Sequence, residues 1–224
     1  MVFGCSGSIG AALKECLDSE KALLSTVGFS RSTTPSIDIT LEDSIVAAAA
    51  EVSALDQPIR LIIDATGFLH GGDIHPEKSL SKIDGYKMAH SMAINAIGPA
   101  LLLKHFLPLL PSEGKAVFCT LSARVGSITD NHLGGWYSYR ASKAALNQIV
   151  KTSAIELKRL RPAALCVTYH PGTVDSSLSY PFLKSGLKLQ SATDAAKACV
   201  SVLDSLKSSD SGGFFDYTGE RVPW

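Results

Sequence analysis

The chain begins with three glycines at a spacing that few local structures use. Gly4, Gly7 and Gly10 follow a short expected strand at residues 2–3 and precede an apolar helical pattern at residues 9–24. Between a strand and a helix, such glycines allow a sharp turn, a close approach of backbone to a pyrophosphate, and tight packing of the helix on the strand. The helix N-terminus adds free N–H groups and partial positive charge. The pattern predicts a phosphate-binding turn, and the alternative is a flexible, glycine-rich N-terminus.

Expected strands and helices alternate along the rest of the chain. Strands are expected over residues 2–3, 26–29, 36–39, 59–65, 115–121, 163–169 and 214–217, and helices over 9–24, 41–55, 80–110, 137–159 and 192–207. The run 59–65 is largely apolar, as in a strand that is buried on both faces. The alternation predicts an α/β fold, in which one parallel sheet carries helices on both faces within a single domain over residues 1–224.

The composition indicates a folded domain without bulk attraction to polyanions. The chain has 224 residues, 46% of them apolar, and a formal net charge of zero, so we expect one large core and no nucleic-acid partner. Apolar runs such as 45–50 and 100–103 are too short to cross a bilayer, so no membrane partner is expected. The five cysteines form no C-x-x-C pair, and no signal-peptide pattern is present, which predicts a cytoplasmic protein.

The end of the second expected strand indicates which dinucleotide would bind. In dinucleotide folds an acidic residue at this place hydrogen-bonds the ribose 2′-hydroxyl. Here the strand ends in Ser30 and Arg31, and arginine can hold a 2′-phosphate with two donors. This favours NADP(H), with NAD(H) still possible; the alternative is that Arg31 is merely solvated.

Four polar residues form a candidate catalytic set. Tyr139 and Lys143 are four apart and share one face of an expected helix. Ser122 follows a strand directly, and Asn95 interrupts an apolar helix, where an amide competes with the backbone. An ammonium about 4 Å from a phenol contributes about 4 kcal/mol at a dielectric near 20, which lowers the phenol pKa by about three units. We therefore expect Lys143 to bring the pKa of Tyr139 toward neutral pH, where acid–base catalysis of carbonyl reduction is efficient.

Taken in order, these motifs resemble short-chain dehydrogenases/reductases, and most of all the C-factor-like and carbonyl reductase-like group. The similarity extends over nearly the whole chain. It implies a catalytic set of Asn95, Ser122, Tyr139 and Lys143. It also implies cofactor contacts from Gly4, Ser6, Gly7, Ser8, Ile9, Gly10, Ser30, Arg31, Asp38, Ile39, Ala65, Thr66, Gly67, Tyr139, Lys143, Pro171, Gly172, Thr173 and Val174.

The resemblance further implies a Rossmann fold of about seven strands in the order 3-2-1-4-5-6-7. Asp38 would face the adenine, Lys143 would also bind the nicotinamide ribose, and the loop 171–174 would hold the carboxamide. Asn95 would hold a water linked to Lys143. The implied substrate is a small carbonyl or alcohol, and the implied assembly is a homodimer or homotetramer. We expect the loop 130–136 and a short segment around 175–190 to lie beside the substrate.

Other functions receive less support from the residues. The six histidines show no metal-ligand spacing, so no metal site is expected. A nucleotide-binding sensor or signalling protein with little turnover is the alternative, and it has no need of Ser122, Tyr139 and Lys143 together. A sugar-nucleotide epimerase or dehydratase needs a larger C-terminal domain than these residues offer.

Overall fold

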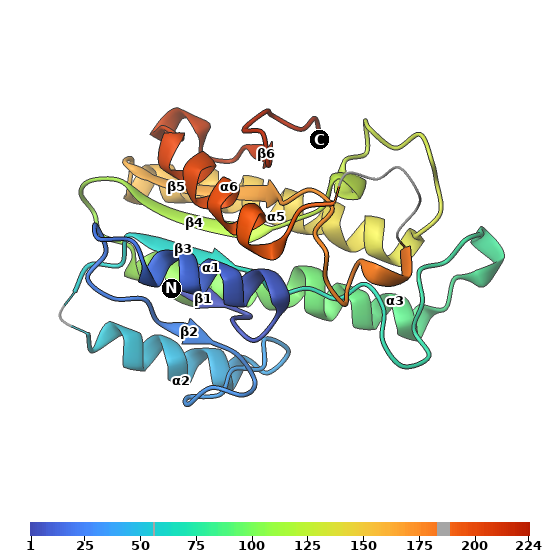
Figure 1. Cartoon of the computed structure of the whole chain (residues 1–224), viewed down its shortest axis with the longest axis horizontal. Helices are drawn as coiled ribbons and strands as arrows, with labels where there is room; N and C mark the ends of the chain where they lie inside the picture. Colours follow the sequence, from blue (N-terminus) through green and yellow to red (C-terminus); the bar gives the residue numbers. More distant parts are fainter. Residues whose placement is uncertain (56, 183–188) are drawn as a thin grey trace.

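One parallel sheet lies at the centre of the computed structural model, which describes residues 1–55, 57–182 and 189–224 (Figure 1). Within these residues the sheet has six strands in the order β2-β1-β3-β4-β5-β6, and each neighbouring pair is parallel. The strands are β1 (Val2–Phe3), β2 (Gly28–Phe29), β3 (Leu61–Asp64), β4 (Ala116–Leu121), β5 (Ala164–His170) and β6 (Phe214–Asp216). The predicted doubly wound α/β fold is confirmed.

The strand expected over residues 36–39 is wrong. Ile37 and Ile39 are both buried in the core, which accounts for the alternating pattern. The backbone nevertheless turns back instead of pairing along β2, because the Thr33 hydroxyl accepts from the Ser30 N–H at 2.9 Å and donates to the Ser30 carbonyl at 2.9 Å. Ile37 N–H also bonds the Ser30 carbonyl, at 2.9 Å. The observed order is the expected one with this edge strand removed.

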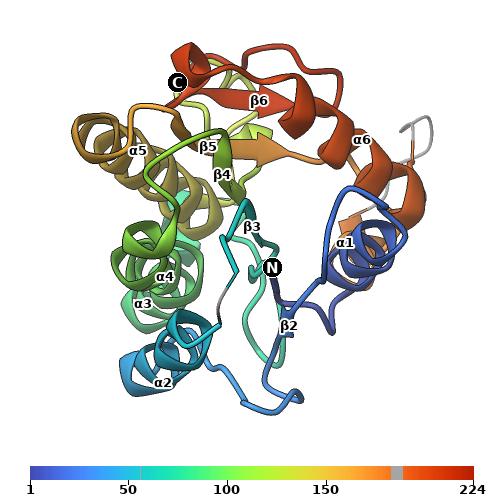
Figure 2. The same cartoon turned by 90° about the vertical axis from the view of Figure 1, so that its left-hand side faces the viewer.

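Helices cover both faces of the sheet, as Figure 2 shows. The helices are α1 (Ser8–Asp18), α2 (Glu42–Ser53), α3 (Gly85–Met92), α4 (Gly98–Phe106), α5 (Tyr137–Leu160) and α6 (Ala192–Ser205). Helices α1 and α6 lie on one face, and α2 to α5 lie on the other. A π-helical turn, η2 (Ala93–Ile97), joins α3 to α4.

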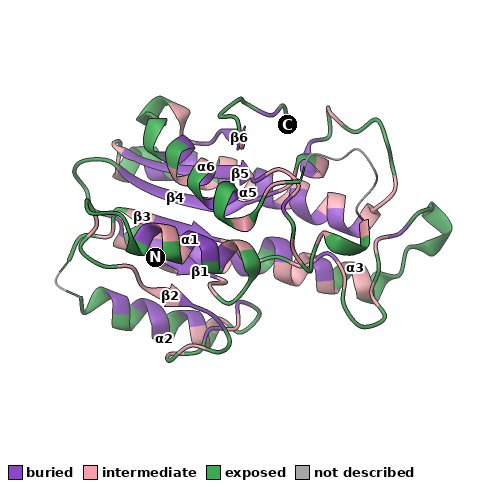
Figure 3. Cartoon of the chain, viewed as in Figure 1, coloured by how far each residue is buried: buried purple, intermediate pink, exposed green. Residues whose placement is uncertain are grey.

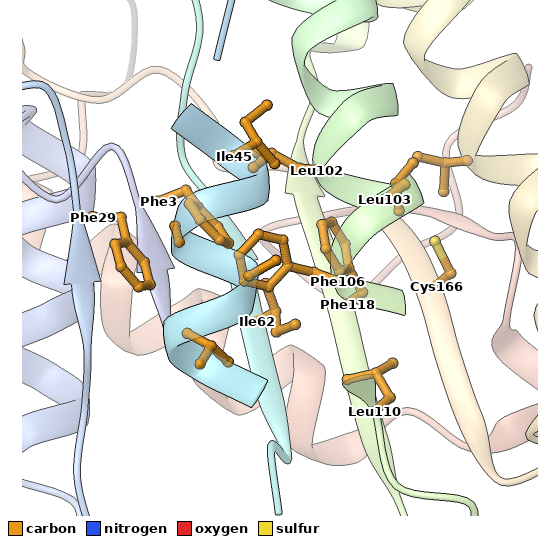
Figure 4. Close-up of a cluster of buried hydrophobic side chains, with 14 of the residues drawn as sticks. Phe3, Phe29, Ile45, Ile62, Leu102, Leu103, Phe106, Leu110, Phe118 and Cys166 are labelled. Carbon is orange, nitrogen blue, oxygen red and sulfur yellow. The ribbon is translucent and has the colours of Figure 1, made fainter. Parts of the chain in front are cut away.

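Each face of the sheet has its own hydrophobic core, and Figure 3 shows the strands buried between them. On the α2–α5 face the Phe3 ring stacks on Phe29 with centroids 5.2 Å apart and meets the edge of Phe106 at 4.8 Å (Figure 4). Aromatic pairs of this kind stabilise a core beyond the area they bury. These contacts hold Phe3 of β1 between β2 and β3.

The helical stretch Gly85–Leu109 is long and apolar enough to cross a membrane by length and composition, with a mean hydropathy of 1.3. The short apolar run 100–103 is only one part of this stretch. In the structure it packs in one layer with α2 and α5 and contributes Leu102, Leu103 and Phe106 to the core. These contacts make it a core helix of the α/β fold.

The loops that follow β3, β4 and β5 gather at the right-hand end of the molecule in Figure 1. This is the end where the parallel strands finish. In open α/β sheets ligands bind in the crevice outside the carboxyl ends of the strands. The candidate site is therefore expected at this end.

Candidate active site

The glycine turn lies between β1 and α1, as the sequence predicts. Gly4 has a φ of +76°, which glycine adopts without strain. A Cβ on Gly10 would lie 2.1 Å from the Gly4 carbonyl oxygen, so only glycine lets α1 approach the turn this closely. Gly7 is the N-cap of α1, and the first turn of this helix has no acidic side chain. Its N-terminus therefore keeps the partial positive charge that favours phosphate.

A cavity of about 390 Å³ opens beside this turn, at the ends of β1, β2 and β3. It brings together nine of the predicted cofactor residues, namely Gly4, Ser6, Gly7, Ser30, Arg31, Ile39, Ala65, Thr66 and Gly67. Phe68, His90 and Ile94 also line it, and they were not predicted. Ser8, Ile9 and Gly10 form the first residues of α1 and do not line the cavity.

The turn after β2 presents Ser30 and Arg31 at the cavity. Ser30 Oγ lies 3.0 Å from Ser32 Oγ, and Arg31 is exposed. Asp38 does not line the cavity, and its carboxylate accepts from the Thr40 N–H at 2.9 Å and the Thr40 hydroxyl at 2.6 Å. Its place facing the adenine stays a prediction. These hydrogen bonds, with a smaller contribution from Arg31, hold the pKa of Asp38 below its usual value.

One face of α5 carries three buried polar side chains at a spacing of four residues: Tyr139, Lys143 and Asn147. Lys143 Nζ donates to the Leu121 carbonyl at 2.8 Å, at the end of β4. Ser122 Oγ donates to Asn147 Oδ1 at 2.7 Å. The predicted serine is thus tied to the helix that carries the predicted tyrosine and lysine.

Asn95 reaches the same cluster from η2. Its side chain accepts from the Phe68 N–H at 2.8 Å and donates to the Phe68 carbonyl at 2.7 Å and to Ser142 Oγ at 3.1 Å. These bonds explain how an amide is accommodated inside an apolar helix. A Cβ on Gly67 would lie 3.6 Å from both Lys143 Nζ and Asn95 Oδ1, and Gly67 also lines the cavity. Gly67 therefore joins the cavity to the polar cluster.

The pKa of Tyr139 departs from its usual value in the direction opposite to the predicted lowering. Burial raises the pKa of Tyr139 above its usual value. Lys143 Nζ lies 6.0 Å from the centroid of the Tyr139 ring, and burial lowers the pKa of Lys143 to about 8. The predicted lowering of the tyrosine pKa rests on the charge of Lys143 alone. Desolvation acts against it, because burial disfavours the charged form of both groups.

Asp64, at the end of β3, is a buried carboxylate close to this cluster. It accepts from the Thr66 N–H at 3.0 Å, from the Thr66 hydroxyl at 2.6 Å and from the Thr120 hydroxyl at 2.7 Å. Burial raises its pKa, and these hydrogen bonds and the charge of Lys143 oppose the increase. In return, the charge of Asp64 opposes the fall in the pKa of Lys143.

The predicted loop 171–174 follows β5 and does not line the cavity. Gly172 has a φ of +77°, and Gln190 Nε2 donates to the Pro171 carbonyl at 3.2 Å. Val174 bridges to Gln190 through parallel backbone pairing. Of the expected substrate segment 175–190, residues 183–188 lie outside the described residues.

Several residues of the site carried no prediction from the sequence. Asn147 continues the four-residue spacing of Tyr139 and Lys143, so the helix face held a signal for it. Asp64 opens the segment 64–67 that resembles a cofactor-lining motif of the family, but its buried partner Thr120 is distant in the sequence. Glu77, whose carboxylate accepts from the Ser138 N–H before α5, had no such signal. Within the described residues, no group of three potential metal ligands comes together.

Comparison with known proteins adds independent findings. The family described as enoyl-(acyl carrier protein) reductase matches residues 13–197. The C-signal protein of Myxococcus xanthus is 35% identical over 147 residues, which cover 65% of this chain and 84% of that protein. A 1-hydroxy-2-glutathionyl-2-methyl-3-butene dehydrogenase of Rhodococcus sp. (strain AD45) is 28% identical over 190 residues, covering 85% of this chain and 79% of the relative.

A solved structure shows the same fold. The NADPH-bound carbonyl reductase from chicken fatty liver superposes with a TM-score of 0.83 at 24% identity, and covers 100% of this chain and 97% of that one. At this identity the likeness extends to the architecture of the sheet and its helices.

Proposed function

The chain belongs to the short-chain dehydrogenase/reductase family of NAD(P)-dependent oxidoreductases, and from this premise we propose that it is an NADP(H)-dependent carbonyl reductase or alcohol dehydrogenase. Hydride would pass between the nicotinamide and a small carbonyl or alcohol compound, with Tyr139 as the acid and base. The observation that carries the proposal is Gly67, which borders both the cavity beside the glycine turn and the cluster of Asn95 and Lys143.

The residues present fit a dinucleotide. The backbone of Gly4 to Gly7 and the N-terminus of α1 would hold the pyrophosphate, because the helix end has no acidic side chain to oppose it. Ala65, Thr66 and Gly67 would border the rest of the molecule along the cavity. When bound, the nicotinamide supplies the hydride and, in its oxidised form, a positive charge.

The chain's own groups would handle the proton. Tyr139 would donate to the carbonyl oxygen. The Ser122 hydroxyl, which donates to Asn147 Oδ1 in this structure, would turn to donate to the carbonyl oxygen and hold it in line. Lys143, fixed on the Leu121 carbonyl, carries the positive charge that favours the tyrosinate. Asn147 positions Ser122, and Asn95 fixes the loop after β3 at Phe68.

The preference for NADP(H) rests on Arg31. Among the described residues that line the cavity there is no acid to bond a free 2′-hydroxyl, while Arg31 stands exposed at its edge. The bound cofactor of the chicken carbonyl reductase is NADPH. A guanidinium matches the geometry of a phosphate better than that of a hydroxyl.

A signalling function with little turnover is the second candidate, because the Myxococcus relative is named C-signal. The buried set of Ser122, Tyr139, Lys143 and Asn147 favours an enzyme. A sensor needs affinity for the nucleotide alone, and burying these polar groups without a catalytic use has a cost in stability.

Tyr139→Phe tests the proposal. The variant removes one hydroxyl and keeps the ring, so NADPH should bind as before while NADPH-dependent reduction of carbonyl compounds falls by about 10²–10⁴-fold, the range of a general acid. Stopped assays over a panel of aldehydes and ketones, together with NADPH titration by fluorescence, give both quantities. Near-normal turnover in the variant would exclude Tyr139 as the acid.

A further inference from the structure

A strained tryptophan lies beside Tyr139 of the candidate site. Trp136 has a φ of +54° and is the only residue other than glycine with a positive φ in the part of the chain that the structure describes. Gly134 and Gly135 before it have φ values of +64° and +65°. Glycine adopts this conformation freely, whereas a bulky side chain does so only when its surroundings enforce it.

Hydrogen bonds on both sides enforce the conformation. The Trp136 N–H donates to the Glu77 carbonyl at 2.5 Å, and the Glu77 carboxylate accepts from the Ser138 N–H at 3.1 Å and from the Ser138 hydroxyl. Arg140 Nε donates to the Gly135 carbonyl at 2.9 Å. Glu77 is buried although it carries a carboxylate, so the turn before α5 is held by one distant segment, at Glu77, and by Arg140 of α5 itself.

The enforced conformation directs the indole to the neighbourhood of Tyr139. The Trp136 ring lies 6.2 Å from the Tyr139 ring and 5.0 Å from Phe182, both at steep angles. Phe182 in turn meets His70 at 5.3 Å, and His70 Nε2 lies 3.1 Å from the Leu178 carbonyl. His70, Trp136 and Phe182, here named the aromatic wall, come from the loops after β3, β4 and β5.

We propose that the aromatic wall selects carbonyl compounds that carry a flat, unsaturated group beside the carbonyl, and that Trp136 is its specificity-determining residue. The inference rests on the proposed function, because it places the reacting carbonyl at Tyr139. A ring attached to that carbonyl then falls next to the indole. Aromatic faces and edges attract one another beyond the area they bury, whereas a saturated ring of the same size gains only the burial.

A matched pair of substrates separates stacking from size. Benzaldehyde and cyclohexanecarboxaldehyde share a carbonyl and a six-membered ring and differ in aromaticity. We expect Trp136→Leu to lower the ratio of kcat/KM for benzaldehyde over cyclohexanecarboxaldehyde by roughly three- to tenfold, the range that aromatic pairs give. Trp136→Phe should keep most of the ratio. Leu133→Ala is the control, because Leu133 is 90% exposed in the same loop and its loss should leave the ratio unchanged.

A binding measurement keeps the test independent of turnover. The chain has two tryptophans, and Trp224 stacks on Phe214, so Trp224→Phe leaves Trp136 as the only indole. Benzaldehyde should quench its emission saturably and more tightly than cyclohexanecarboxaldehyde does. Absence of turnover with every aldehyde would contradict the proposed function. The quenching would still measure whether the aromatic wall binds benzaldehyde in preference to the saturated aldehyde. If Trp136→Leu lowered kcat/KM equally for both aldehydes, or if both aldehydes quenched the Trp136 emission equally, the inference would be overturned and Trp136 would be a packing residue.

Discussion

At the level of single residues, the site is governed by charges that the fold has removed from water. Asp64 is fully buried beside Thr66 and Thr120, and Lys143 is buried on the helix opposite. Each charge partly offsets the desolvation of the other. Such coupled groups are where pKa values depart from those of free side chains, and where a small change in one group is felt by its neighbour.

Asp64→Asn is expected to change the pH dependence of stability. Because the pKa of Asp64 is raised, the folded protein binds more protons than the unfolded chain above about pH 3.9, and stability is lost as the pH rises through that window. Asparagine does not ionise, so the variant does not lose stability in this way as the pH rises. Its side-chain oxygen can still accept hydrogen bonds from Thr66. The free energy of unfolding of the variant, relative to the natural protein, should therefore rise between pH 4 and pH 8 in urea titrations.

The same substitution should also change the pH dependence of activity. The pKa of Lys143 is about 8, and without the carboxylate it should fall lower still. The alkaline limb of the pH profile of kcat/KM should then move to lower pH by about one unit or less, which corresponds to at most ~1.4 kcal/mol. Asp43→Asn is the control, because Asp43 is exposed on α2. An unchanged alkaline limb would show that Asp64 does not act on Lys143.

Arg31→Ala tests the cofactor preference at a single exposed side chain. Loss of two charge-assisted hydrogen bonds to a 2′-phosphate should weaken NADPH by about 10- to 100-fold, since such bonds contribute ~1.5–3 kcal/mol. NADH lacks this phosphate, so its affinity should change by less than about threefold, within the effect of a surface substitution. Parallel fluorescence titrations measure both, and equal losses would remove the assignment of Arg31.

At the level of elements, the site depends on how closely α1 and α5 approach the sheet. Gly10 brings α1 onto the turn after β1, and Gly126 brings the loop after β4 onto α5, where a Cβ would lie 2.8 Å from Lys143 Cβ. The long α5 then holds Tyr139, Lys143 and Asn147 in one line. These close contacts fix the distance between the glycine turn and the polar cluster.

Gly10→Ala is expected to disrupt the turn. Its Cβ would meet the backbone of Gly4 at 2.1 Å, and because backbone cannot move aside cheaply, the free energy of unfolding should fall by about 1–3 kcal/mol. NADPH affinity should fall with it.

Gly7→Ala is the matched control. Gly7 has a φ of −81°, and its Cβ would lie 3.4 Å from the Gly4 carbonyl, so the fold should accept it. Chemical denaturation compares the two variants. Equal stability of Gly10→Ala and the natural protein would contradict the close packing of α1.

At the level of the whole molecule, one sheet lies between two hydrophobic cores, and the outer surface of the α3–α5 layer is exposed. Ile97 and Ile155 are 55% and 53% exposed on helices whose other sides are buried. By its family resemblance this layer would pack against a second copy, so we propose a homodimer or homotetramer. Exposed apolar side chains on such a face gain from burial in an interface.

Ile155→Glu tests the assembly. A charge in the centre of an apolar interface is strongly unfavourable, so the variant should shift toward the monomer in light scattering coupled to size-exclusion chromatography. Lys158→Glu, on the same helix, is the control for charge alone. A monomer of the natural protein at micromolar concentration would contradict the proposal.

Local spacing in the sequence was enough to predict several features of this protein. The glycine turn, the alternation of strands and helices, and the four-residue separation of Tyr139 and Lys143 follow from neighbours in the chain, and the structure brings most of their residues to one end of the sheet. Other features depend on contacts between segments that are far apart in the chain. Residues 36–39 have the pattern of a strand but no backbone pairing along β2. The raised pKa of Tyr139, the burial of Asp64 and the strained Trp136 depend on desolvation and on partners distant in the sequence, which no local pattern records.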